Sequence, residues 1–316
     1  MLVVDGGDLF WRTPQMSPRQ RTEQQIKAEL QLEVLTDSGI DAMVPGQSDL
    51  ALGVPWLQEK AAAFEAPYVA ANLVCAGVAP FPPRVQVKVA DLDVWVIGVL
   101  SPNEAVPEGC SVTEVRPAVE RALADAGDAQ LVVLLSRQSA GEDAALAEVE
   151  PRLDLIVGGG SRTTRPEPLI LAHDTARLEV GSRGKKLALA TVGWKPGAQG
   201  FHSAASVDAI EASMARMKKR QASTVEQLEK AEGSKSKERQ EKRLQFYAKE
   251  LAELEAELAL ARTPQAQPAH GIELSLLPLD STIPDHPQTA EKLAATLAIL
   301  EPLQNKPVTP EDLIGL

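Results

Sequence analysis

Short apolar runs alternate with amphipathic or alanine-rich stretches over residues 1–195. Strand-length runs rich in Val, Ile and Leu predict β-strands, and stretches with apolar residues at helical spacing predict α-helices. The predicted strands cover residues 1–4, 41–44, 67–71, 84–89, 93–100, 130–135, 153–157, 168–172, 175–180 and 186–192. The predicted helices cover residues 19–38, 55–64, 115–126 and 140–148.

The order of these elements predicts an α/β fold with mixed sheets. Helices that alternate with buried strands cover the faces of a sheet. Residues 84–100 and 168–192 contain consecutive strands with no helix between them, which predicts antiparallel hairpins. We therefore expect a mixed sandwich of sheets and helices rather than a purely parallel, doubly wound sheet.

Residues 204–262 differ in composition from the rest of the chain. Gly, Pro and aromatic residues nearly vanish there, while Glu, Lys, Ala, Gln and Arg dominate. Apolar residues recur at steps of three and four, which is the spacing of a coiled-coil seam. The predicted seam residues are Ile210, Met214, Met217, Tyr247, Leu251, Leu254 and Leu258.

The interruption at residues 233–236 predicts how this segment folds. A fold about Ser234 places Met214 opposite Leu254, and the other seam residues then fall into register as well. We therefore predict an antiparallel helical hairpin with arms of about 25 residues, roughly 40 Å each. The alternative is one continuous helix that dimerises with another chain, which Gly and Ser in mid-helix disfavour.

The last part of the chain is predicted to return to the first. A linker rich in Pro, Gln and Ala covers 264–268, a strand covers 271–278 and a helix covers 287–303. We expect the strand to complete the main domain, so that the hairpin is an insertion between neighbouring elements. The domain organisation is then 1–203 for the main domain, 204–262 for the inserted hairpin and 263–316 for the returning segment.

Composition excludes several classes of function. The chain has 32 Lys and Arg against 44 Asp and Glu, a net charge of −12, which argues against a nucleic acid or an anionic membrane as the main partner. No apolar run reaches the length of a transmembrane helix. The chain has no signal peptide and opens on a predicted strand, so we expect upstream sequence to be missing.

The two cysteines, Cys75 and Cys110, are too few for a disulfide framework or a cysteine-based metal site. A single bridge between them is open from sequence alone. We favour the interpretation that they are separate, small, buried apolar residues.

Blocks of residues along the first 162 positions resemble a known family in their order. An acidic pair, Asp5 and Asp8, follows the first strand, where α/β folds place metal ligands. The other blocks are residues 35–53, Val-Ala-Ala-Asn-Leu at 69–73, the strand 94–100 with Ser-Pro after it, Val-Val-Leu-Leu-Ser-Arg at 132–137 with Asp143, and Leu-Asp-Leu-Ile-Val-Gly-Gly-Gly-Ser-Arg at 153–162. This series resembles the calcineurin-like metallophosphoesterases, in particular their 5′-nucleotidase and UDP-sugar hydrolase branch. The resemblance implies a four-layer α-β-β-α sandwich.

The resemblance also implies where an active site would lie. In the family, Asp, Asn and His side chains hold two metal ions, which activate a water molecule and stabilise the phosphoryl transition state. The corresponding positions here are Asp8, Gln47, Ser48, Asp49, Arg137, Gly160 and Arg162. Asp8, the bridging carboxylate, keeps its family residue, and the family's opening Asp-x-His block would precede Met1.

The other positions have lost the family's lone-pair donors. Gln47 stands where the family has its Asn ligand and Ser48 where it has a catalytic His, while Arg137, Gly160 and Arg162 replace three ligand histidines. A guanidinium stays protonated and repels a divalent cation. The chain's four histidines lie outside these blocks: His173, His202, His270 and His286. We therefore expect no metal, no other cofactor and no catalytic residue.

Two interpretations of the arginines follow. Arg137 and Arg162 either form ion pairs with Asp8 or Asp49, which we favour, or they bind a small anion such as a phosphate, a nucleotide or a carboxylate. The glycines at 158–160 lack the pattern of a dinucleotide-binding loop. Asp5 is interpreted as a turn-forming carboxylate.

The sequence therefore predicts a non-catalytic binding or scaffold protein that acts through its helical hairpin. The hairpin is either a solvated spacer or an arm for a protein partner or for self-association. The alternatives are a small-anion or nucleotide-binding module at Arg137 and Arg162, and a hydrolase of 5′-nucleotidase type with residual metal binding. The family resemblance alone suggests the periplasm or the cell envelope.

Overall fold

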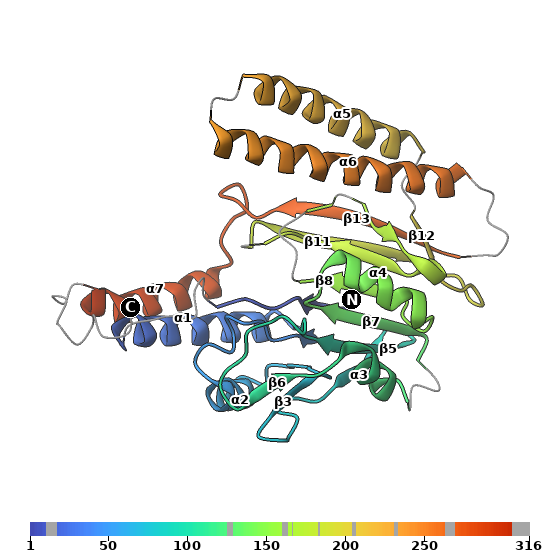
Figure 1. The fold of residues 1–316 in the computed structure, drawn as a ribbon. Helices are drawn as coiled ribbons and strands as arrows, with labels where there is room; N and C mark the ends of the chain where they lie inside the picture. Colours follow the sequence, from blue (N-terminus) through green and yellow to red (C-terminus); the bar gives the residue numbers. More distant parts are fainter. Residues whose placement is uncertain are drawn as a thin grey trace.

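The protein is a mixed α/β body with a pair of long helices on one side (Figure 1). The computed structural model describes residues 1–10, 18–124, 129–159, 164–165, 167–182, 184–203, 207–230, 233–262 and 269–304. The α/β class predicted from the alternation of strands and helices is confirmed. Within the described residues, no helix has the length and apolar character that crossing a membrane requires.

A six-stranded sheet forms the centre of the body. Its order is β4-β5-β7-β8-β10-β9. The inner pairs are parallel, whereas β4 and β9 at the two edges are antiparallel to their neighbours. The strands are β4 (Arg84–Val89), β5 (Leu92–Val99), β7 (Leu131–Ser136), β8 (Leu155–Gly158), β10 (Ala176–Glu179) and β9 (Leu169–Ile170).

Both faces of this sheet are buried, as the continuous apolar runs predict. Alternate residues of β7 enter different cores: Val133 and Leu135 pack on one face, and Val132 and Leu134 on the other. Helices α3 (Val115–Ala122) and α4 (Ala140–Val149) cover the second face. A capping box between Ser139 and Glu142 begins α4, so its start is specified locally.

A three-stranded sheet covers part of the face of the six-stranded sheet on which Val133 and Leu135 lie. Its order is β11-β13-β12, with β13 antiparallel to β11 and parallel to β12. Ile272 and Leu274 of β13 join the larger core, whereas Leu187 and Leu277 on the opposite face are exposed. The strands are β11 (Lys186–Gly193), β12 (Phe201–Ser203) and β13 (His270–Pro278).

Two further strand pairs and the remaining helices lie around the larger of the two apolar cores, which contains Val133 and Leu135. Strands β1 (Val4–Asp5) and β2 (Ala42–Met43) are parallel, and β3 (Leu73–Cys75) and β6 (Cys110–Val112) are antiparallel. Helices α1 (Pro18–Asp37) and α7 (Pro287–Gln304) lie side by side (Figure 1), and Lys292 of α7 bonds to Glu33 and Asp37 of α1 at 2.6 Å. Helix α2 (Val54–Ala63) and the short helix η1 (Ala172–Asp174) complete the body.

The expectation of two separate cysteines is wrong. Cys75 and Cys110 are joined by a disulfide bond. The register of β3 and β6 places the two residues directly opposite each other. Both are partly exposed rather than buried in the core. Because β6 has only three residues, no sequence pattern predicted it, and the pairing could not be anticipated.

Other elements also differ from the sequence predictions. Residues 67–71 are not a regular strand; Tyr68 makes one isolated bridge to Met43, and the ladder begins only at Leu73. The short strands β6 and β12 were not predicted. The stretch 168–192 forms one antiparallel pair, β9 with β10, while β11 belongs to another sheet.

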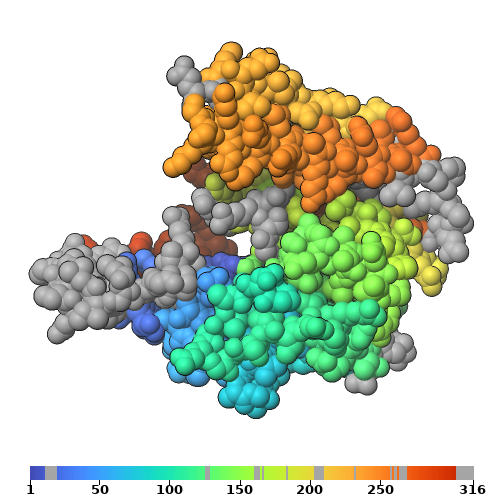
Figure 2. All heavy atoms as spheres, viewed as in Figure 1, coloured from blue at the N-terminus to red at the C-terminus, as the bar shows by residue number. Residues whose placement is uncertain are grey.

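Helices α5 (Val207–Glu229) and α6 (Ser234–Arg262), here called the helical arm, pack side by side and run in opposite directions (Figure 1). Figure 2 shows their atoms together on one side of the molecule. Their shared core contains Ile210, Met214, Leu251 and Leu254, with Met217 and Leu258 packed against it. Tyr247 is buried farther along α6. Six of the seven seam residues predicted from their spacing therefore pack together between the two helices.

The helical arm is fixed to the body by polar contacts. Arg165, which is buried beside the end of β10, donates hydrogen bonds to Glu250 at 3.2 Å and Glu253 at 2.9 Å on α6. Ser213 of α5 donates to Glu167 at 3.4 Å. The strands on either side of the arm, β12 and β13, are neighbours in one sheet.

Candidate functional site

The candidate site lies where several strands of the body end. The loop after β1, the loop after β2 and the residues that follow β7 and β8 meet there. Two glycines permit the closest approach: a Cβ on Gly6 would lie 2.6 Å from Cα of Gly159. Since no side chain fits between these two backbones, the glycines serve close packing here.

Arg137, directly after β7, occupies the middle of this site. Its Nη1 donates to the carbonyl oxygens of Gly6 at 3.1 Å and Gly159 at 2.7 Å. Its Nη2 forms ion pairs with the carboxylates of Asp8 and of Glu104, the latter at 3.1 Å. The Arg137 side chain is only 6% exposed and that of Glu104 only 7%. The guanidinium is thus enclosed by protein acceptors.

The electrostatics of this cluster favour a charged arginine. Burial lowers the pKa of Arg137, but the neighbouring carboxylates of Glu104 and Asp8 outweigh burial and raise that pKa. Nε of Arg137 is buried without a hydrogen-bond partner among the described residues. The cluster thus has one buried guanidinium between two carboxylates, of which that of Glu104 is buried and that of Asp8 is 38% exposed.

Asp49 organises the loop that faces Arg137. One carboxylate oxygen accepts from the backbone N–H groups of Asp8 and Gly46, both at 2.8 Å, and the other accepts from those of Leu9 at 2.9 Å and Phe10 at 3.3 Å. Burial, with a contribution from the Asp8 and Asp5 carboxylates, raises the pKa of Asp49 to about 7, although the Gly46 and Asp8 N–H groups lower it. Asp49 therefore holds two loops together and forms no ion pair with Arg137.

Ser48 and Gln47 donate hydrogen bonds to the two carboxylates that pair with Arg137. The hydroxyl of Ser48 donates to Oδ1 of Asp8 at 2.8 Å, and its backbone N–H donates to the same atom at 2.9 Å. The backbone N–H of Gln47 donates to Glu104 at 2.9 Å. Both Asp8 oxygens thus bind groups of this chain, one through Ser48 and one through Arg137.

A second buried charge cluster adjoins the site. Arg177 of β10 is fully buried, and its Nε donates to Asp143 at 2.8 Å while its Nη1 pairs with Glu179. Ser136, the last residue of β7, donates to the same Asp143 at 2.5 Å. Burial raises the pKa of Asp143, and the charge of Arg177 lowers it. This network anchors the end of β7 and hence the residue that follows, Arg137.

The structure brings most of the sequence-predicted site residues together. Asp8, Gln47, Ser48, Asp49 and Arg137 all lie in one cluster, and Asp5 accepts from the N–H of Gly7 at 2.8 Å, as a turn-forming carboxylate does. Gly160 and Arg162 lie outside the described residues. Glu104 was missed, because it lies in an irregular loop outside every sequence block.

The residues present do not fit the divalent metals that the resemblance implies. A ligand at the position of Arg137 would have to donate a lone pair, and a guanidinium has none to donate. Its positive charge instead takes the carboxylate oxygens of Asp8 and Glu104, which a cation would need. Among the described residues, no group of three or more His, Cys, Asp and Glu side chains is arranged to hold a metal.

No family model and no curated protein matches the chain. Solved structures do match it. The sulfate thiohydrolase SoxB of Thermus thermophilus, in complex with glycerol, aligns over 98% of this chain with a TM-score of 0.62 and 21% identity. A 5′-nucleotidase precursor from Thermus thermophilus aligns over 96% with a TM-score of 0.60 and 17% identity.

A third match is the calcineurin-like phosphoesterase YfkN from Bacillus subtilis, with a TM-score of 0.59 and 13% identity over 96% of this chain. This chain has the calcineurin-like phosphoesterase fold. It spans 85% of the YfkN chain, but only 44% of SoxB and 50% of the nucleotidase precursor. The order of the sequence blocks predicted this fold, and the similarity to these solved structures confirms it.

Proposed function

We propose that this chain is a non-catalytic binding or scaffold module built on a calcineurin-like phosphoesterase fold. The observation that supports this proposal most is the place of Arg137. Its guanidinium lies between Asp8 and Glu104 and bonds to two backbone carbonyls. Hydrolysis by two metal ions requires lone-pair donors around a cation, and a fixed guanidinium excludes that cation by charge.

The same contacts weigh against an anion site at Arg137. Recognition of a phosphate or carboxylate by arginine uses free N–H groups on the edge of the guanidinium. Both terminal nitrogens of Arg137 already donate to acceptors of this chain. The ion-pair interpretation is therefore the better supported one at this position.

The helical arm is the part that we propose carries the binding function. In this proposal the body is a four-layer sandwich of the phosphoesterase type, and residues 204–262 are an insertion that forms a short antiparallel coiled coil. The burial of Ile210, Met214, Leu251 and Leu254 between the two helices supports a coiled-coil seam. The adjacency of β12 and β13 supports an insertion.

Metal content and turnover test the non-catalytic proposal directly. We expect elemental analysis of the purified chain to find far less than one equivalent of zinc, manganese or iron. We also expect no hydrolysis of AMP or of bis(p-nitrophenyl) phosphate when Mn²⁺ or Zn²⁺ is added, while a 5′-nucleotidase assayed alongside turns over both. Stoichiometric metal together with turnover would establish a hydrolase of 5′-nucleotidase type and overturn the proposal.

A further inference from the structure

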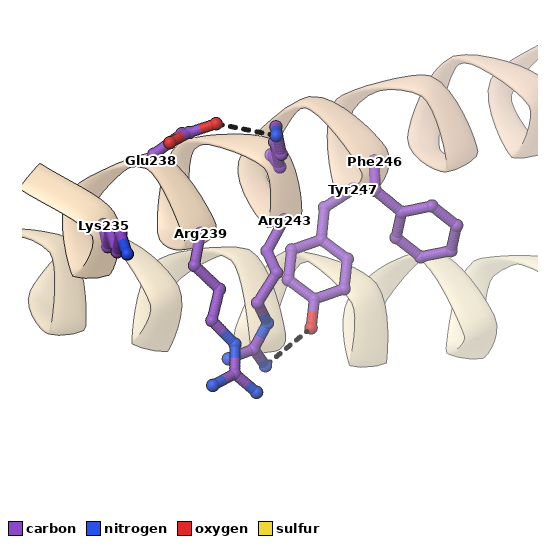
Figure 3. Close-up of a pocket in the computed structure, with 7 residues that line it drawn as sticks. Lys235, Glu238, Arg239, Arg243, Phe246 and Tyr247 are labelled. Atoms are coloured by element: carbon purple, nitrogen blue, oxygen red, sulfur yellow. Dashed lines mark hydrogen bonds and ion pairs between the residues drawn. The ribbon is translucent and has the colours of Figure 1, made fainter. Parts of the chain in front are cut away.

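A groove lies along one face of α6, near the end of the helical arm at which this helix begins (Figure 3). Its volume is about 630 Å³. It is lined by Lys235, Glu238, Arg239, Lys242, Arg243, Phe246 and Tyr247. The site described above uses none of these residues, so the groove is a separate feature of the molecule.

The groove is strongly basic in an acidic protein. Lys235, Arg239, Lys242 and Arg243 line it, against one acid, Glu238. Glu238 pairs with Lys242 at 2.7 Å, whereas Lys235 and Arg239 form no ion pair with any described residue. The whole chain has a net charge of −12. Such a local concentration of unpaired positive charge attracts an acidic ligand.

An aromatic pair adds an apolar contact surface beside these charges. Phe246 is 43% exposed, and its ring centroid lies 5.7 Å from that of the buried Tyr247. The hydroxyl of Tyr247 accepts from Arg243 at 3.3 Å, which orients that guanidinium within the groove. Aromatic residues and arginine together are the residue types that carry most binding energy at protein interfaces.

The spacing of these residues defines the shape of a ligand. Arg239, Arg243 and Tyr247 point to the same side of α6 (Figure 3), and Lys235 lies one turn earlier. From residue 235 to residue 246 the helix rises by roughly 17 Å. A peptide segment that follows the helix could place several carboxylates along this length and one apolar side chain at its end.

We propose that this groove binds an acidic segment of a partner protein, with an apolar side chain of that segment packed against Phe246. This inference rests on the proposed binding function and names its partner class. An open groove that follows one helix and carries one exposed aromatic ring suits an extended peptide segment. An anionic membrane is an extended surface that would also face the acidic parts of this chain, whereas a short acidic segment meets only the groove.

A labelled peptide tests this proposal on the full chain. The probe is a fluorescein-labelled peptide of roughly 20 residues, made of Glu and Ala with one Phe, and binding is followed by fluorescence anisotropy. We expect saturable binding that weakens with salt, because charge contacts are screened. The same peptide with Phe replaced by Ala is expected to bind more weakly, as is the chain with Phe246→Ala.

Two charge-reversal variants locate the site. We expect Lys235→Glu/Arg239→Glu to weaken peptide binding by roughly tenfold or more. The matched control is Lys218→Glu/Lys219→Glu, which makes the same change in charge at exposed residues of α5 outside the groove, and is expected to stay within about twofold of the wild type. All these side chains are on the helix surface, and circular dichroism verifies that each variant folds.

Several outcomes would overturn the proposal. Equal weakening in both variants would show unspecific charge attraction, and absence of binding would remove the site altogether. Tighter binding to vesicles containing phosphatidylglycerol than to the peptide would assign the groove to a membrane, and concentration-dependent dimerisation lost in Lys235→Glu/Arg239→Glu would assign it to a second copy. None of these results changes metal content or phosphoester turnover, so the proposed function is judged separately.

Discussion

Arg137 illustrates how one side chain changes the chemistry of a whole site. The carboxylates of the buried Glu104 and the partly exposed Asp8 lie close together and repel each other, so a positive charge between them is stabilising. A guanidinium meets this need with a permanent charge and a planar set of donors. In this chain those donors also satisfy the carbonyl oxygens of Gly6 and Gly159, which lie at the ends of two strands. Arg137 thus balances the charge of the two carboxylates and also holds the two loops in place.

Replacing Arg137 by Leu is expected to destabilise the protein by about 3 kcal/mol, because Asp8 and Glu104 then face each other without a counter-charge. We place the effect at the low end for buried pairs since the Asp8 side chain is 38% exposed. Urea unfolding measures the change. The exposed pair Arg116–Glu120 offers the control: Arg116→Leu is expected to cost less than about 0.5 kcal/mol. Equal costs for the two variants would contradict the role given to Arg137.

Asp154 is expected to make stability depend on pH. Burial raises its pKa to about 6, and the hydrogen bond from the Val132 N–H only partly opposes this. Because the folded state holds the proton more tightly than the unfolded state, the contribution of Asp154 is full below about pH 3.8 and is lost as the pH rises through about 6.

The variant Asp154→Asn tests this dependence. Asparagine can still accept from Val132 but does not titrate. We therefore expect the free energy of unfolding of the wild type to fall relative to that of the variant between about pH 4 and about pH 6.5. Urea titrations at several pH values measure it, and parallel curves for the two proteins would show that Asp154 does not titrate as expected.

At the scale of elements, the disulfide joins two very short strands. Cys75 and Cys110 are separated by 35 positions in sequence. A cross-link of this span restricts the unfolded chain, so the variant Cys75→Ser/Cys110→Ser is expected to lose about 3 kcal/mol of stability. Thermal and urea unfolding measure the loss. Reductant should lower the stability of the wild type by a similar amount and leave the variant unchanged; an effect on the variant would point to another cause.

The helical arm is expected to open locally before the body unfolds. Its own core is small, formed by Ile210, Met214, Leu251 and Leu254. Truncating one of these, Leu254→Ala, removes packing worth about 2–3 kcal/mol. Hydrogen exchange should then accelerate across α5 and α6 while the strands of the six-stranded sheet keep their protection. The same truncation at the exposed Leu297 of α7 is the control and should leave exchange in the arm unchanged. Uniform acceleration in body and arm after Leu254→Ala would show a single cooperative unit.

The sequence could predict the elements that are long enough for their pattern of apolar residues to repeat. Strands β5 and β7 bury both faces and read as continuous apolar runs, and α2 and α4 were located to within one residue at each end. Strands β6 and β12 have three residues each, too few for any periodicity to emerge. Residues 68–70 of the apolar stretch 67–71 are buried, because the chain passes through the core there without forming a β-ladder.

The candidate site was predictable only in part, for a physical reason. Asp8 and Arg137 belong to blocks that adjoin regular strands, so their proximity follows from the resemblance. Glu104 is 33 positions from Arg137 and lies in an irregular loop, where no pattern shows which side chain turns inward. The disulfide could not be predicted for the same reason, because it depends on the register of β6, a strand that no sequence pattern predicts.

At the scale of the whole molecule, the body and the helical arm differ in how they are held together. The body has two large apolar cores on either side of one sheet, whereas the arm is narrow and is held by ion pairs from Arg165. Motion between them is expected to be larger than motion within either. We expect the basic groove, which lies on the arm, to move with the arm relative to the body.

Removal of divalent metal is expected to leave the stability of the whole molecule unchanged. A protein that binds a metal only when folded gains stability from it, and a chelator then lowers its melting temperature. Since Arg137 supplies the positive charge at the site, we expect the same melting temperature with EDTA, with Mn²⁺ and with Zn²⁺, within about one degree. Differential scanning calorimetry measures it. A rise of several degrees with either metal would contradict the fixed-charge interpretation.

The parallel pairing of β12 with β13 has a consequence for the reach of the protein. The chain leaves the sheet at Ser203 and returns at His270, and these residues lie within a few ladder positions of each other. Any number of helical turns can therefore be inserted between them without altering the register of the sheet. Roughly seven residues added to each helix would move the tip outward by about 10 Å. The length of the arm can thus differ between related chains without any change in the sheet that carries it.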